Sequence, residues 1–466
     1  MKTPIVDFVR AYAEKEMLRF HMPGHKGKPF LSPEPYDITE IQGADALYEA
    51  SGIIRESERN AASLFGTLDT FYSTEGSSQV IRAMLYLAAL YARKRKGAGR
   101  FRVLAARNVH KSFLYACAAL DAEISWLPGD ADASLLSIRT TKAKLLETLE
   151  KTETLPDAVF VTSPDYPGSI QDIRGFSEVL RPLHIPLLVD DAHGAYLHFL
   201  ETPAHPMDLG ADLCADSAHK TLPALTGCAY LHIGENAAFP EMSRFFKENA
   251  KQALAFFGST SPSYLLLQSL DLVNAYLDGP YREKLAAFVK EADAVKSCLD
   301  AAGFTLFGEE PLKLTLLTLP YGYTGEEMAE ILRACKIECE FADRECIVFM
   351  LTPENGRGEL CALEKALLSI GKRAALLPEK AVLPPYRPAL SVREAFLLPS
   401  RRVPVEEAVG RIAGPVSVSC PPAVPVVISG ELITEAHLPL LRRYGVIALP
   451  VAETAAEEEK SSFSAD

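Results

Sequence analysis

The stretch "PLLVDDAH", residues 186–193, is an apolar run that ends in two aspartates and a histidine. A second run of this kind, "ADLCADSAHK" at 211–220, ends in Ser217, His219 and Lys220. Short apolar runs bounded by polar residues predict buried strands that lead into loops. Such strands place their last side chains at the sheet edge where α/β proteins bind ligands.

The same pattern extends through the first half of the chain. Apolar runs at 101–107, 158–164 and 227–234 predict three further strands. Apolar residues recur at helical spacing in the segments 77–97, 111–122 and 169–183. This alternation predicts an α/β fold with a mostly parallel sheet covered by helices on both faces.

The composition of the 466 residues, with 48% hydrophobic and 23% charged, is that of a soluble globular protein. A net charge of −13 argues against nucleic acid or an anionic membrane surface as a partner. No apolar run reaches the roughly 18 residues of a membrane span, and the N-terminus lacks a secretory pattern. The nine scattered cysteines form no CxxC pair, which favours reduced thiols and a cytoplasmic location.

Three polar segments point to one chemistry. Asp190 ends one predicted strand, Lys220 follows another, and "TEGSSQ" (74–79) begins a predicted helix. A buried lysine can lose its proton and attack an aldehyde, and an aspartate can keep a pyridine nitrogen protonated. A Gly/Ser-rich helix N-terminus offers N–H and hydroxyl donors to a phosphate. Together the segments predict a site for pyridoxal 5'-phosphate.

Each segment alone has a simpler interpretation. Serines at a helix start are more often caps, an aspartate after a strand can cap the next helix, and a loop lysine is usually solvated. It is the occurrence of all three in a strand–helix context that favours the cofactor site.

Six blocks of the chain resemble the Orn/Lys/Arg decarboxylase family of fold-type-I pyridoxal phosphate enzymes. They occur in the family's order between residues 20 and 271: "FHMPGHKG", "ARNVHKSFLYA", "VTSPDYPGSIQDI", "VDDAHGAYLHF", "ADSAHKTLPALTG" and "SPSYLLLQSLD". The segment 403–434 resembles the family's C-terminal domain. The chain looks like the short branch, without the receiver-like N-terminal domain of the long enzymes.

The resemblance implies a role for each candidate residue. Lys220 matches the lysine that forms the imine with the cofactor, Asp190 the pyridinium partner, and His110 the histidine that stacks on the ring. His219 matches a residue near substrate and proton transfer, and His193 one beside the ring. Phosphate-binding positions are matched by Ser77, Ser78 and Ser217, with Gly76 supplying backbone N–H. From the residues alone, His110 could merely start a helix, and His193 and His219 could be structural.

The segment "HMPGHKG" (21–27) carries two histidines at a spacing that suits metal ligands. The Pro-Gly between His21 and His25 breaks the helix that would align them, so we expect no metal there. We expect a loop near the active-site mouth or a dimer contact. Three cysteines, Cys335, Cys339 and Cys346, lack a neighbouring histidine and also predict no metal.

Four parts are expected along the chain. A helical stretch at about 262–302 precedes two strand-like runs, and a Pro-rich segment at 382–390 precedes the C-terminal region. The expected parts are a pyridoxal phosphate-binding large domain with the N-terminal segment (1–304), a small α+β domain (305–380), a C-terminal Orn/Lys/Arg decarboxylase-like domain (381–450) and a disordered acidic tail (451–466).

The resemblance implies decarboxylation of arginine, lysine or ornithine to CO2 and a polyamine-related amine, by a homodimer or higher homo-oligomer. Alternatives are an aminotransferase or lyase on the same fold, a non-catalytic descendant, or a metal-dependent hydrolase using His21, His25, Asp190 and His193. The distal group of a basic substrate needs a carboxylate, for which Glu40, Asp45 and Glu345 are candidates.

The chain departs from the family pattern at three positions. Glu75 replaces an asparagine beside the phosphate segment, where a carboxylate would repel the phosphate unless it points away or pairs with a cation. Cys420 stands where tyrosine is usual, and Ala423 where glycine is usual. The last two bear on substrate specificity more than on cofactor binding.

Overall fold

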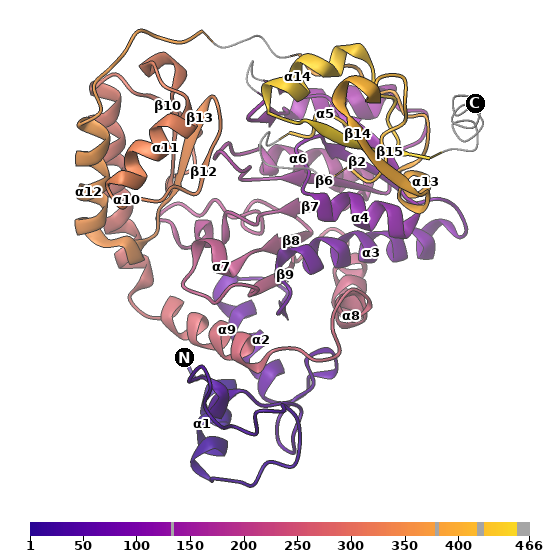
Figure 1. Ribbon diagram of the computed structural model, residues 1–466. Coiled ribbons are helices and arrows are strands. Elements are labelled where there is room, and N and C mark those ends of the chain that lie inside the picture. Colours follow the sequence, from indigo (N-terminus) through magenta and orange to yellow (C-terminus); the bar gives the residue numbers. More distant parts are fainter. Residues whose placement is uncertain (132–134, 378–381, 417–423, 454–466) are drawn as a thin grey trace, which may run out of the picture.

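The computed structural model describes residues 1–131, 135–377, 382–416 and 424–453. Its centre is a seven-stranded sheet with the order β1-β9-β8-β7-β6-β2-β3 (Figure 1). The strands are β1 (Asp69–Ser73), β2 (Arg102–Ala106), β3 (Glu123–Leu127), β6 (Ala158–Thr162), β7 (Leu187–Asp190), β8 (Leu213–Asp216) and β9 (Ala229–Ile233).

The sheet is mostly parallel, as predicted. Strands β3, β2, β6, β7 and β8 run parallel, and β9 and β1 add antiparallel neighbours at one side. Asp190, the last residue of β7, pairs with Thr162 of β6 and Ala215 of β8. The segments that follow β7 and β8 therefore leave the sheet at the same edge.

Helices cover both faces of this sheet, because its strands are apolar on both sides. In β6, Ala158 and Phe160 pack into one core, whereas Val159 and Val161 pack into the other. This two-residue alternation is that of a strand buried between two layers. The first core is covered by α3 (Gly76–Lys96), α4 (Lys111–Leu120) and α8 (Pro240–Phe256), and the second by α5 (Lys142–Lys151) and α6 (Ile173–Leu180).

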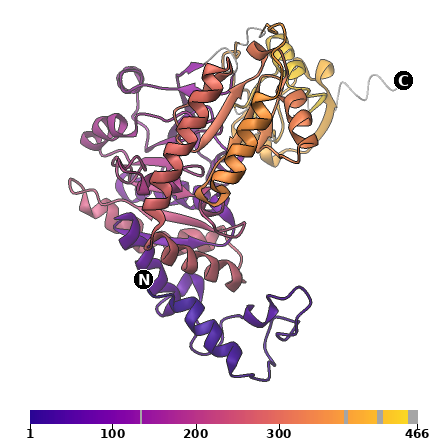
Figure 2. The same ribbon diagram turned by 90° about the vertical axis from the view of Figure 1, so that its left-hand side faces the viewer.

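The N-terminal region packs against helices from later in the chain. Helix α1 (Pro4–Glu14) contacts α2 (Ile53–Phe65) and α9 (Tyr264–Leu277). The segment between α1 and α2 extends away from the body of the molecule (Figures 1 and 2). We call residues 15–35 of this segment the N-terminal arm.

The stretch 262–302, predicted as one helical stretch, forms two helices. Helix α9 ends at Leu277, and α10 (Tyr281–Ala301) begins after the sequence Asp278-Gly279-Pro280. Proline has no backbone N–H to continue a helix, so the chain turns and restarts there.

A second, antiparallel sheet follows α10. Its strand order is β10-β11-β13-β12, formed by β10 (Thr305–Phe307), β11 (Lys313–Leu317), β12 (Phe341–Ala342) and β13 (Cys346–Met350). The helices α11 (Gly325–Ala334) and α12 (Gly356–Leu368) belong to this region, and α10 packs against α12 (Figure 2). A helix from before residue 305 therefore helps to cover the small sheet.

The C-terminal region packs an apolar cluster around a two-stranded sheet, and Leu135 and Ile138 of the large region join this cluster. It contains α13 (Val392–Leu397), β14 (Ser400–Pro404), α14 (Leu438–Arg443) and β15 (Ala448–Ala452), and α13 contacts α4 of the large region. Strand β15 extends two residues past the predicted end of this region at 450. Of the predicted disordered tail (451–466), residues 454–466 lie outside the described residues, and the four-part division stays a prediction.

Strands β4 (Asp130–Ala131) and β5 (Ile138–Arg139) form a further short antiparallel hairpin. Within the described ranges, no helix combines the length and the apolar content that crossing a bilayer requires.

Candidate active site

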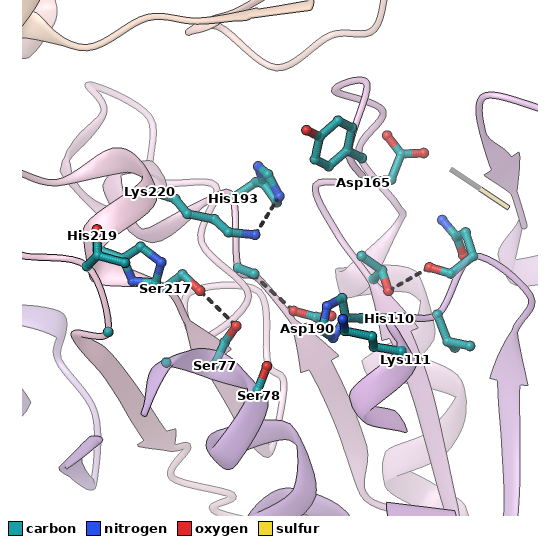
Figure 3. Close-up of a pocket in the computed structure, with 18 of the residues that line it drawn as sticks. Ser77, Ser78, His110, Lys111, Asp165, Asp190, His193, Ser217, His219 and Lys220 are labelled. Carbon is teal, nitrogen blue, oxygen red and sulfur yellow. Dashed lines mark hydrogen bonds between the residues drawn. The ribbon is translucent and has the colours of Figure 1, made fainter. Parts of the chain in front are cut away.

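A cavity of about 520 Å³ opens at the edge of the large sheet where β7 and β8 end. All nine residues proposed for the cofactor site line this one cavity: Gly76, Ser77, Ser78, His110, Asp190, His193, Ser217, His219 and Lys220. All of them except Gly76 are labelled in Figure 3. Their individual roles stay predictions, but they come from four separate segments of the chain. Parallel strands that end at one edge bring these segments together.

The short helix α7 (Ala218–Thr221) presents the lysine. It follows β8 directly, and its last turn carries His219 and Lys220. The Lys220 Nζ lies 3.0 Å from His193 Nε2 (Figure 3). On the other side of the imidazole, Lys313 Nζ lies 2.8 Å from His193 Nδ1. His193 therefore bridges two lysines, Lys220 of helix α7 and Lys313 of strand β11 in the small sheet.

Asp190 lies at the floor of the cavity and is 2% exposed. Its Oδ1 accepts a hydrogen bond of 3.2 Å from the Ala192 N–H. Burial raises the pKa of Asp190 to about 6, although the nearby Lys220 opposes this rise. A buried carboxyl group of this kind is suited to bind a protonated ring nitrogen, because the pair would neutralise each other.

His110 is the N-cap of α4, as its simpler interpretation predicted, and it also lines the cavity. Its Nδ1 accepts the Ser112 N–H at 3.3 Å, which fixes the plane of the ring. Desolvation in the cavity and the positive charges of Lys220 and Lys111 lower the pKa of His110. The ring is thus neutral at physiological pH, and a neutral ring can stack on another ring without a buried charge.

The residues predicted to bind the cofactor phosphate lie at the N-terminus of α3, a helix of 21 residues. Gly76 has φ +70°, a conformation that favours glycine, and Ser217 Oγ donates to Ser77 Oγ at 2.7 Å (Figure 3). The Glu75 carboxylate accepts a hydrogen bond from the Ser259 N–H. Glu75, which stands where the family has asparagine, thus has a hydrogen-bond donor beside the N-terminus of α3.

A family model for the major domain of Orn/Lys/Arg decarboxylases matches residues 3–310. The chain belongs to the Orn/Lys/Arg decarboxylase family. An arginine decarboxylase of Bacillus subtilis is 29% identical over 492 residues, covering 97% of this chain and 95% of its own. An arginine decarboxylase of Halalkalibacterium halodurans is 30% identical over 483 residues with the same two coverages.

Solved structures agree with this assignment at the level of the fold. The lysine decarboxylase of Francisella novicida superposes with a TM-score of 0.78 at 16% identity, covering 97% of this chain and 81% of its own. The family model and the two relatives confirm the predicted family, and the structural likeness confirms the fold-type-I α/β class. By family, the chain is an amino acid decarboxylase, as predicted.

A buried polar cluster lies beside the active site of this decarboxylase. Ligand-type atoms of Asp191, His205, Cys214 and Asp216 lie within 4.8 Å of one another. The Met207 N–H donates to His205 Nδ1 at 3.2 Å, so the ring proton resides on Nε2. That Nε2–H faces Asp191 Oδ2 and Asp216 Oδ2, each at 3.0 Å. A protonated nitrogen has no lone pair for a metal, so the cluster is a hydrogen-bonded support.

The cluster places a negative charge one residue before Ser217. Burial opposes ionisation of Asp216, but contacts with His205 and His232 lower its pKa below the usual range. Burial and the neighbouring Asp216 raise the pKa of Asp191 well above its usual value. Sequence analysis assigned no role to His205 or His232, because both lie outside the matching motifs.

Several other candidates lie away from the cavity. His21 Nε2 contacts the Tyr12 hydroxyl at 2.7 Å, and His25 Nε2 contacts Asp37 Oδ2 at 3.2 Å. Neither histidine is among the described residues that line the cavity, so they do not join Asp190 and His193 as the hydrolase alternative requires.

The three carboxylates suggested for a distal substrate group also lie elsewhere. Asp45 accepts N–H groups at the start of α2, and Glu345 pairs with Arg443 of the C-terminal region. Within the described chain, neither these two nor Glu40 lines the cavity. Two of the departures from the family pattern, Cys420 and Ala423, lie outside the described residues.

Proposed function

We propose that this protein is a pyridoxal 5'-phosphate-dependent decarboxylase of arginine, lysine or ornithine that forms a polyamine-related amine. The observation that carries the proposal is the single cavity lined by Lys220, Asp190 and the N-terminus of α3. The names of the curated relatives, which are arginine decarboxylases, support a basic amino acid as substrate.

The residues of the cavity fit this cofactor. An aldehyde requires an amine, which Lys220 supplies, and a pyridinium nitrogen requires a buried carboxylate, which Asp190 supplies. A phosphate requires N–H and hydroxyl donors, which Gly76, Ser77 and Ser217 supply at the start of a long helix. Each functional group of the cofactor thus has a chemically matched partner at the edge of one sheet.

Pyridoxal phosphate, when bound, supplies an aldehyde that captures amines and a ring that withdraws electrons from the substrate. Lys220 would hold the cofactor by its Nζ, and Asp190 would hold the proton on the ring nitrogen. His110 and His193 would limit the movement of the ring, and Lys220 or His219 would return a proton to the substrate Cα after CO2 leaves. Ser77, Ser78 and Ser217 would bind the phosphate.

The purified protein is expected to show a visible absorption band that borohydride bleaches, with pyridoxyl mass on the Lys220 peptide. With carboxyl-labelled arginine, lysine or ornithine it is expected to release labelled CO2 without any added keto acid. An aminotransferase would require the keto acid and retain the carboxyl carbon. A protein that stays colourless after incubation with pyridoxal phosphate would contradict the proposal and favour a non-catalytic descendant.

The N-terminal arm supports a homodimer. It exposes six large apolar side chains, of which the most exposed are Leu18 (84%), Phe20 (94%), Phe30 (80%) and Leu31 (84%). Burial of such a side chain in an interface is worth about 1.5–3 kcal/mol. The arm extends away from the body of its own chain (Figure 2). We therefore propose that its apolar side chains pack against a second copy of the chain.

The double variant Phe20→Ser/Leu31→Ser is expected to weaken dimerisation by at least about 100-fold, because two apolar anchors are lost from each arm. Sedimentation velocity over a range of concentrations measures this change. The control is Ile447→Ser, which removes an equally exposed apolar side chain (83%) outside the arm. An arm variant that dimerises like the control would show that the arm is not the interface.

The cysteines support the predicted cytoplasmic location. All eight cysteines in the described part of the chain are free thiols, and several are buried. Thiols of this kind persist in reducing compartments, and we propose that the enzyme acts in one.

A further inference from the structure

Lys313 is a buried lysine that reaches the active site from the small sheet. It is the first residue of β11, is 4% exposed, and is the one charged residue of a buried strand whose other residues are three leucines and Thr315. Its Nζ donates to the Tyr166 carbonyl at 3.1 Å and lies 2.8 Å from His193 Nδ1. The other nitrogen of His193, Nε2, lies 3.0 Å from Lys220 Nζ. The sequence motifs of the family region did not indicate this residue.

The direction of these hydrogen bonds follows from the number of protons available. A lysine ammonium has three N–H donors and accepts nothing, so Lys313 donates to both Tyr166 and His193. The Nδ1 that accepts this bond must lack a proton, which leaves the single ring proton on Nε2. Burial, and next to it the positive charge of Lys313, lower the pKa of His193 well below its usual value, so the ring carries one proton only.

The Nε2–H of His193 therefore points at Lys220 as a donor. To receive this bond, the Lys220 nitrogen must offer a lone pair, which only the neutral amine has. The neutral amine is the nucleophilic form of lysine. If Lys313 were the neutral amine instead, both hydrogen bonds of His193 could reverse. Lys220 could then donate to His193 as an ammonium.

The surroundings of the two lysines decide where the shared proton stays. Burial lowers the pKa of Lys313 to about 8, against the opposing charges of Glu310, Asp165 and Glu340. A pKa near 8 leaves Lys313 mostly protonated at neutral pH. Lys220 faces Asp190, which favours its charged form, and the positive or ionisable groups Lys313, His193 and His110, which oppose it.

We propose that Lys313 is a positioning residue which, through His193, holds the amine of Lys220 in its neutral form. This inference rests on the proposed function, because it assigns Lys220 the task of reacting with a carbonyl group. It also links the small sheet to the active site, since Lys313 is in place only when β11 packs beside the loop that carries Tyr166.

The test measures the reactivity of Lys220 in the full-length protein freed of cofactor. Reductive methylation with labelled formaldehyde modifies only neutral amines, and mass spectrometry of peptides reads each lysine separately. Across pH 6–11, we expect Lys220 to reach half of its maximal rate at least about one pH unit below Lys365, an exposed lysine of α12 outside the arm. Lys313→Met is expected to move this midpoint upward and to reduce labelling of Lys220 at pH 7.5 by about 10-fold.

Lys296→Met is the matched control. Lys296 is a part-buried lysine of the same region that donates to the Glu310 and Pro311 carbonyls and has no bond to His193. Its removal is expected to leave the Lys220 midpoint unchanged, whereas Lys313→Arg, which keeps a charged donor, is expected to retain most of the wild-type behaviour. Should Lys313→Met fail to fold by circular dichroism, Lys313→Gln replaces it and is expected to shift the midpoint in the same direction.

Two results would overturn the proposal. One is a wild-type protein in which the midpoint of Lys220 equals that of Lys365, a comparison that needs no variant. The other is a folded Lys313 variant whose midpoint matches that of Lys296→Met. Because the labelling uses neither pyridoxal phosphate nor an amino acid, its outcome is separate from that of the borohydride and CO2 experiments.

Discussion

Replacing Lys220 with alanine is expected to reduce CO2 release from a basic amino acid by at least about 10³-fold. The substitution removes the amine that would hold the cofactor and the nearest group that could return a proton, and proton transfer alone contributes about 10²- to 10⁴-fold. Lys220 lies in α7 at the cavity wall, so the fold should be unaffected. Initial rates with carboxyl-labelled substrate measure the loss, with circular dichroism as the check on folding.

Two further measurements sharpen this test. Lys142→Ala removes an exposed lysine that pairs with Glu178 outside the cavity, and it is expected to keep the wild-type rate. A small primary amine added to Lys220→Ala is expected to recover part of the lost activity, because it can enter the space left by the side chain. A Lys220→Ala enzyme that retains even a tenth of the wild-type rate would remove Lys220 from the mechanism.

The large sheet could be predicted because its signals are local. Apolar runs with polar ends fixed the strands that end at Asp190 and Asp216, and helical spacing fixed the helices between them. The break at Pro280 shows the limit of this reasoning, since a helical pattern on both sides concealed a proline that ends one helix before another begins. Side chains at strand ends could be gathered into one site because parallel strands share an edge.

The partners of the site residues could not be predicted, because they are set by long-range packing. Lys313 follows Lys220 by more than ninety residues and reaches it only through the contact of the small sheet with the Tyr166 loop. His205 and His232 approach Asp216 across neighbouring segments, and no motif marks them. A single charged residue in a mostly apolar strand was the one available signal for Lys313, since burying an unpaired charge is costly.

Replacing Asp190 with asparagine is expected to lower the decarboxylation rate by about 10²- to 10³-fold, the range typical of losing one preorganised electrostatic contact. Asparagine keeps the size of the side chain and can still accept the Ala192 N–H, but it carries no charge to hold a proton on the ring nitrogen. Initial rates with saturating pyridoxal phosphate measure the effect. An unchanged rate would mean that the ring nitrogen needs no carboxylate here.

The same substitution is expected to stabilise the protein freed of cofactor at pH 8. Burial raises the pKa of Asp190 from its ordinary 3.8 to about 6, so the native state holds this proton more tightly than the unfolded chain does. The stability that Asp190 contributes is therefore complete below about pH 4 and is lost as the pH rises through 6, a change of about 3 kcal/mol. Asparagine does not titrate and avoids this loss.

Urea unfolding of the two cofactor-free proteins at several pH values distinguishes the effect of this one group from those of other buried acids. The variant and the wild type are expected to have similar unfolding free energies at pH 4, and the variant is expected to be more stable by up to about 3 kcal/mol at pH 8. Lower stability of the variant at pH 8 would mean that a cation already neutralises Asp190. A variant that is more stable but inactive would instead show that the charge of Asp190 destabilises the cofactor-free protein and is needed for its ligand. A bound cationic ring would supply the missing counter-charge.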